Sequence, residues 1–120
     1  MISGYLLDEQ LPKWWRREII RHAPGLAIWK VGDPQAPPLQ APDPVLLAWC
    51  EARNCLLLTN NRHSMPGHLA EHVRQGRQMP GIFVLDPKMN VARLAYALEL
   101  IAAASFESEY QNQINYFPLL

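Results

Sequence analysis

This chain of 120 residues has only two cysteines, no excess of charge of either sign and no long hydrophobic run. Cys50 and Cys55 follow neither a metal-binding nor a redox spacing, so we expect buried free thiols in a reducing compartment. Eleven basic residues balance eleven acidic ones, so binding to nucleic acid or membrane would have to come from a local patch. No stretch approaches the roughly 20 apolar residues that a membrane span needs.

The first residues and the overall composition indicate a cytoplasmic globular protein. The segment MISGYLLDEQLP has no basic region, and Asp8 and Glu9 interrupt its apolar run, so we expect no signal peptide. Hydrophobic residues make up 49% of the chain and charged residues 18%, a globular balance. At this length we expect a single domain over residues 1–120.

Short apolar runs alternate with amphipathic segments along the chain. The runs predict strands at 5–7, 26–29, 55–59 and 81–85, with a weaker one at 114–120. Helices should begin near Pro12, at an Asp43 cap before Pro44, at Ser64 and at Asn90. This alternation predicts an α/β fold: three α/β/α layers around a mainly parallel sheet of four to five strands.

Apolar spacing predicts which helix faces are buried, and proline predicts where regular structure is excluded. The segment VGDPQAPPLQAPDP is too rich in proline for a helix or strand, so it must be a stiff loop, acting either as a lid or as a connector. The side chains expected to face the core are Leu11, Trp15 and Ile19 in the first helix, Val45, Leu46, Trp49 and Cys50 in the second, and Val91, Leu94, Ala95, Leu98, Ile101 and Ala102 in the last.

Polar residues gather where the predicted strands end. Asp8, Asn61 and Asp86 follow three of the strands, and Asp43 begins the helix after the proline loop. In open parallel sheets the ligand site lies beyond the carboxyl ends of the strands, so these side chains can converge. Carboxylate oxygens suit a hard divalent cation such as Mg²⁺, which makes Asp8, Asp43 and Asp86 the candidate metal ligands.

Each of these residues also has a purely structural interpretation. Asp43 stands where a helix cap is expected, and Asp86 before Pro87 is a common turn residue. Asp8 closes a buried strand and has less structural reason to be acidic, which favours a functional role.

Four motifs in this order, LLDEQLP, VGDP with a following PD, TNNRHSM and GIFVL, resemble the PIN-like family over nearly the whole chain. More narrowly, they resemble a short, often bacterial subfamily of it. The resemblance implies a compact α/β nuclease that uses acidic residues and Mg²⁺ or Mn²⁺ to cut RNA. Such proteins are often the toxin of a pair, with an antitoxin protein as partner.

Matching the motifs position by position implies that Asp8 and Asp43 are the first two acidic site residues. The third acidic position falls on Asn61, which is a departure from the family pattern. A carboxamide offers a carbonyl oxygen without charge, which should weaken cation binding, and Asp86 could supply the missing carboxylate.

Basic and aromatic residues near these positions suggest how RNA would be held. Arg62 can bind a phosphate, which suits its planar guanidinium. Trp14 could stack on a base or form a dimer contact. A basic helix face could follow an RNA backbone, although a solvated helix face has the same composition; its residues are Lys13, Arg16, Arg17 and Arg21.

Three histidines lie close in sequence, so a zinc site is a further alternative. His68 and His72 would share a helix face, and His63 lies just before that helix. Exposed helix histidines are commoner, and no Cys, Asp or Glu stands at a motif spacing.

The sequence leaves three hypotheses. The leading one is a metal-dependent endoribonuclease whose catalytic residues are Asp8, Asp43, Asn61 and Asp86, with Arg62, Lys13 and Arg17 binding substrate. The second is an inactive PIN-like module that binds RNA or a protein partner, favoured by Asn61. The third is a homodimeric structural protein that uses its tryptophans and the apolar tail from Ile114 as an interface.

Overall fold

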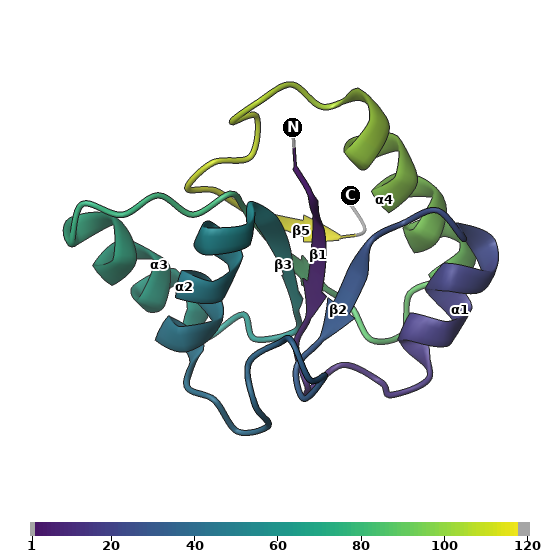
Figure 1. Cartoon of the computed structure of the whole chain (residues 1–120), viewed down its shortest axis with the longest axis horizontal. Helices are drawn as coiled ribbons and strands as arrows, with labels where there is room; N and C mark the ends of the chain where they lie inside the picture. The colour runs from purple at the N-terminus through teal and green to yellow at the C-terminus, as the bar shows by residue number, and fades with distance from the viewer. Residues whose placement is uncertain (1, 118–120) are drawn as a thin grey trace.

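The computed structural model describes residues 2–117 and has a three-layer α/β/α architecture (Figure 1). The strands are β1 (Gly4–Leu7), β2 (Ile28–Lys30), β3 (Cys55–Thr59), β4 (Ile82–Leu85) and β5 (Ile114–Phe117). The helices are α1 (Trp15–His22), α2 (Asp43–Arg53), α3 (Met65–Arg74) and α4 (Val91–Ala104). All strand pairs are parallel, in the order β2-β1-β3-β4-β5. The predicted fold class is therefore confirmed.

The sheet separates two hydrophobic cores, each closed by one pair of helices. The helices α1 and α4 cover one face and α2 and α3 the other (Figure 1). Every residue of β3 is buried, which explains its uninterrupted apolar sequence. Leu94 and Leu98 of α4 are fully buried on the first face, as their spacing predicts, and Asn90 caps this helix by accepting from the Arg93 N–H.

Three details of the sequence prediction were wrong. The first helix begins at Trp15, because Pro12 opens a preceding turn in which its carbonyl accepts from the Trp15 N–H at 3.1 Å. The second strand runs from Ile28 to Lys30; it is a half-buried edge strand, so its sequence carries a weak signal. Val45 is 42% exposed instead of buried, and Leu47 takes its place in the core.

The proline-rich loop between β2 and α2 is fixed to the body of the protein. The indole of Trp49 donates to the Gln35 carbonyl at 3.0 Å, and the Gln40 N–H donates to Glu9 Oε1 at 2.5 Å. Within the loop, the Gly32 N–H donates to the Pro37 carbonyl at 2.8 Å. These bonds attach the loop to α2 and to the segment that follows β1.

The C-terminal segment is part of the sheet. Residues 114–117 form β5, which pairs with β4, and the ring of Phe117 stacks on Phe83 with centroids 4.8 Å apart. The predicted strand extended to Leu120, but residues 118–120 lie outside the described part of the chain. Over residues 2–117, none of the helices combines the length and apolar character needed to cross a membrane.

Candidate functional site

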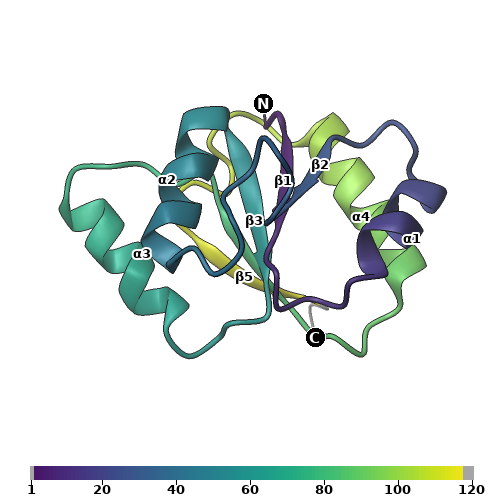
Figure 2. The same cartoon turned by 60° about the horizontal axis from the view of Figure 1, so that its bottom comes forward.

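The candidate site lies where the chain reverses its direction of winding across the sheet. β1 and β3 are neighbours, and their following loops leave the same edge in opposite directions, one toward α1 and the other toward α3 (Figure 2). Ligand sites of open parallel sheets form in the crevice at such a point. Asp8 follows β1 directly, and Thr59 is the last residue of β3.

Asp8 is held in this crevice by its own backbone and by Thr59. Its N–H donates to the Leu58 carbonyl at 2.9 Å, which continues the pairing of β1 with β3 by one residue. Its Oδ2 accepts from the Thr59 hydroxyl at 2.8 Å, and the residue is only 6% exposed. Both ends of this contact are buried, so the carboxylate has a fixed position.

The surroundings of Asp8 disfavour its negative charge. Burial is the largest effect and raises the pKa of the Asp8 carboxyl, and the nearby charge of Asp43 raises it further. Hydrogen bonds from Thr59 and from the backbone of Glu9 and Gln10 act in the opposite direction but do not offset the rise. Within residues 2–117 no lysine, arginine or histidine forms an ion pair with Asp8. A bound cation would supply the missing charge.

Asp43 approaches the same crevice from the other side. It is the first residue of α2, and the N-cap position is held by Pro42. Its Oδ2 instead accepts from Asn61 Nδ2 at 2.9 Å, and His68 Nε2 lies 3.5 Å from the same oxygen. The capping interpretation of Asp43 is therefore wrong, and its carboxylate faces the site.

Asn61 presents its amide nitrogen, and not its carbonyl oxygen, to Asp43. Its Oδ1 accepts from the Ser64 N–H at 3.1 Å, which fixes the orientation of the carboxamide. Its Nδ2 donates to Asp43 and, at 2.7 Å, to Ser64 Oγ. In this geometry Asn61 positions Asp43 and does not offer the oxygen ligand that we expected from it.

Asp86 and Arg62 line a neighbouring cavity of about 650 Å³ at the ends of β3, β4 and β5. Asp86 Oδ1 accepts from the Lys88 N–H at 2.9 Å, as in the turn interpretation, and no contact in the described chain joins it to Asp8 or Asp43. The Arg62 guanidinium lies over the ring of Tyr116, 5.7 Å from its centroid. The structure thus groups Asp8, Asp43 and Asn61 together, and places Asp86 with Arg62.

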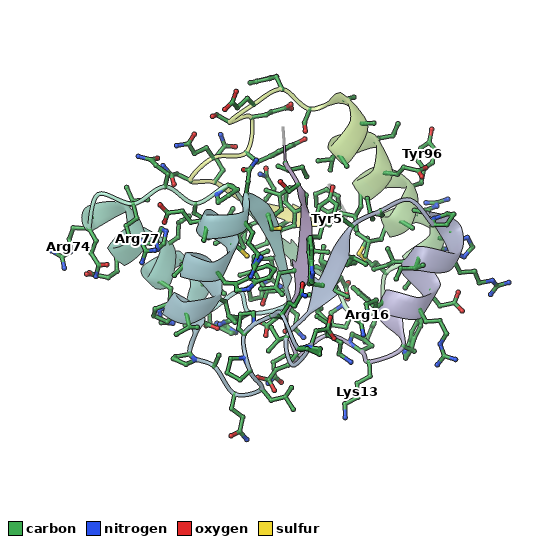
Figure 3. The ribbon with its side chains drawn as sticks, viewed as in Figure 1. Tyr5, Lys13, Arg16, Arg74, Arg77 and Tyr96 are labelled. Atoms are coloured by element: carbon green, nitrogen blue, oxygen red, sulfur yellow. The ribbon has the colours of Figure 1, made fainter. Side chains whose placement is uncertain are left out.

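The predicted basic face of α1 is smaller than its sequence suggests. Arg16 is paired with Asp33, and Arg21 lies 3.4 Å from Glu18. Lys13 and Arg17 are exposed and form no ion pair within residues 2–117. Lys13 extends away from the molecule at the edge of the sheet where β1 ends (Figure 3). Both remain available to a phosphate backbone.

The three histidines do not come together. His72 is buried and its Nε2 lies 2.8 Å from Glu51 Oε1, which also accepts from Arg77, so it links α3 to α2. His68 contacts Asp43 instead, and His63 is exposed. No group of three His, Cys, Asp or Glu side chains that could hold a metal ion occurs in residues 2–117. The zinc alternative therefore gains no support from this arrangement.

Two polar residues of the site were missed in the sequence. Thr59 binds Asp8, and Ser64 fixes the Asn61 amide. The sequence held one signal for Thr59: it is a polar residue at the end of an apolar strand, as Asp8 is at the end of another. Comparison of the chain with family models, with curated proteins and with solved structures found no significant match.

Proposed function

We propose that the protein is a metal-dependent endoribonuclease in which Asp8 and Asp43 bind Mg²⁺ or Mn²⁺. One observation carries this proposal: two carboxylates converge at the reversal point of a parallel sheet without a basic ion-pair partner for the buried one. The negative charge of Asp8 destabilises the folded protein at this position. An uncharged residue would fill a purely structural role equally well. A cation site gives a reason for the charge.

The remaining residues have roles that follow from their contacts. Thr59 holds Asp8 and Asn61 holds Asp43, so the two carboxylates keep their separation. A cation bound between them would lower the pKa of a bound water and neutralise charge on a phosphodiester. Arg62 would bind a substrate phosphate. Lys13 and Arg17 would contact phosphates of the RNA that lie farther from the cleaved bond.

The alternative is a module that binds RNA without cutting it. The bond from Asn61 to Asp43 supports this alternative, because an amide donor satisfies the carboxylate where an active site would need a further oxygen ligand. The two proposals differ in metal binding. A nuclease should bind Mn²⁺ in a titration followed by electron paramagnetic resonance, and Asp8→Asn should abolish that binding.

The decisive experiment is cleavage of a mixed RNA by the purified protein in Mn²⁺ and in EDTA. Asp8→Asn should lose at least 100-fold of the metal-dependent rate, because a role in holding the cation is worth about 3 kcal/mol or more of barrier. Glu99→Gln is the matched control, since it makes the same acid-to-amide change on the exposed surface of α4. Cleavage that persists in Asp8→Asn, or in EDTA, would overturn the proposal.

A further inference from the structure

We propose that the cavity beside the carboxylate pair binds one nucleotide of single-stranded RNA, with the base against Tyr116 and a phosphate on Arg62. This inference rests on the proposed ribonuclease function and adds the way in which the substrate is held. It is argued from the shape of the cavity, its charge and its exposed aromatic surface.

The cavity has the size and position of a subsite. Its volume of about 650 Å³ falls within the range of small-molecule sites, which is about 300–1,000 Å³. Asn60 and Arg62, both on its wall, flank Asn61 in the chain, and Asn61 holds Asp43. A nucleotide in the cavity would therefore lie next to a phosphodiester at the carboxylates.

Arg62 carries a charge that no acid of the described chain neutralises. Its side chain is exposed, and its guanidinium lies over the ring of Tyr116, 5.7 Å from the ring centroid. An aromatic ring orients the guanidinium without neutralising it, so the N–H groups can form charge-assisted bonds to a phosphate. The protein has no net charge, so this local cation matters more than any overall field.

Tyr116 supplies an aromatic surface that the fold does not bury. It is 42% exposed although it lies in a strand of the sheet, whereas its neighbour Phe117 is packed on Phe83. Bases of single strands stack on such rings and on guanidinium planes. A duplex keeps its bases stacked on one another, so the surface suits a single strand.

A polar group on the wall can contribute to recognition of a base. Asp86 lines the cavity, and its Oδ1 accepts from the Lys88 N–H in the turn after β4. A carboxylate can also accept a hydrogen bond from the amino group of a base edge.

The test is fluorescence anisotropy with a labelled single-stranded RNA of mixed sequence, in EDTA and low salt. Tyr116→Leu should raise Kd by about fivefold or more, the usual loss when one stacked base is removed, and Tyr116→Phe should bind like the wild type. Arg62→Gln should raise Kd and lower the slope of log K against log salt by about 1. The matched controls are Tyr96→Leu and Arg93→Gln, exposed on α4 (Figure 3 shows Tyr96), and neither should change Kd.

Because the assay contains no metal, it separates this inference from the nuclease proposal. RNA binding that depends on Tyr116 and Arg62 in a protein that cuts nothing would support the subsite and refute the nuclease. Metal-dependent cleavage with unchanged Kd in both variants would support the nuclease and overturn the subsite. The subsite is also overturned if Tyr116→Leu and Tyr96→Leu weaken RNA binding equally, or if the protein binds duplex RNA as tightly as single-stranded RNA. Single-stranded DNA of the same sequence shows whether the 2′-hydroxyl contributes to binding.

Discussion

Asp8 is the residue on which the interpretation of this protein depends most. It is buried, it contacts another polar side chain, and its charge is disfavoured both by burial and by Asp43. Side chains kept in an unfavourable state are characteristic of sites where function has been favoured over stability. Two consequences can be measured without knowing the substrate.

The first concerns stability and pH. The folded-state pKa of Asp8 is raised, so the folded protein binds its proton more tightly than the unfolded chain. Ionised Asp8 therefore destabilises the fold at pH 7, and this cost disappears as the pH falls below the unfolded pKa of about 3.9. Asp8→Asn should melt at a higher temperature than the wild type at pH 7, and the difference should shrink toward zero near pH 3.5. Thermal unfolding followed by circular dichroism at both values tests this, and a less stable variant at pH 7 would contradict it.

The second concerns the amide that faces Asp43. Asn61→Asp removes the donor to Asp43 Oδ2 and puts a like charge in its place, while the Ser64 N–H keeps its acceptor. Without metal, we expect the free energy of unfolding to fall by about 1–3 kcal/mol. We also expect Mn²⁺ to stabilise the variant more than it stabilises the wild type. Thermal melts with and without Mn²⁺ measure both.

Asn60→Asp is the control for that experiment. It adds the same charge one position earlier, where the side chain contacts Gln10 instead of Asp43, so its Mn²⁺ response should be smaller. Equal responses of the two variants would mean that Asn61 has no special relation to the site.

At the scale of elements, the C-terminal segment is a strand of the sheet, β5. The sequence offered residues from Ile114 both as a weak strand and as part of a dimer interface; Ile114–Phe117 pairs with β4 and forms an edge strand of the sheet. Removing this segment would expose β4 and destabilise the fold, so a changed elution volume of a truncated chain would not report on a dimer.

A point substitution tests the role of β5 more cleanly. Phe117→Ala removes the ring stacked on Phe83 and should lower the free energy of unfolding by about 1–3 kcal/mol. Phe106→Ala removes a ring that is 70% exposed and should change it by less than about 0.5 kcal/mol. Urea denaturation of both variants gives the comparison; similar values would show that β5 contributes little.

The same scale shows what the sequence could predict. The strand β3 was predicted with its bounds because its apolar run is uninterrupted, and α4 because a capping asparagine precedes a long apolar stripe. The strand β2 was misplaced because a half-buried edge strand of three residues has almost no pattern. The start of α1 was misplaced because proline is tolerated both in a first helical turn and in the turn before it.

For the site, the sequence could indicate which residues end the strands but not how they contact one another. Asp8 was predictable as an acid that closes a buried strand. The bond from Asn61 to Asp43 joins the end of β3 to the start of α2, so it depends on how the helix is placed over the sheet. The orientation of the Asn61 amide depends on one backbone N–H of Ser64, which has no sequence signal.

For the molecule as a whole, the proline-rich loop determines how the site is presented. Asp43 lies directly after this loop, whose course is fixed by bonds to Trp49 and Glu9. Proline limits the conformations open to the unfolded chain, so the folded loop is reached with a smaller loss of backbone entropy. The second carboxylate of the site is therefore preorganised, and a ligand that binds there would lose little affinity to ordering the protein.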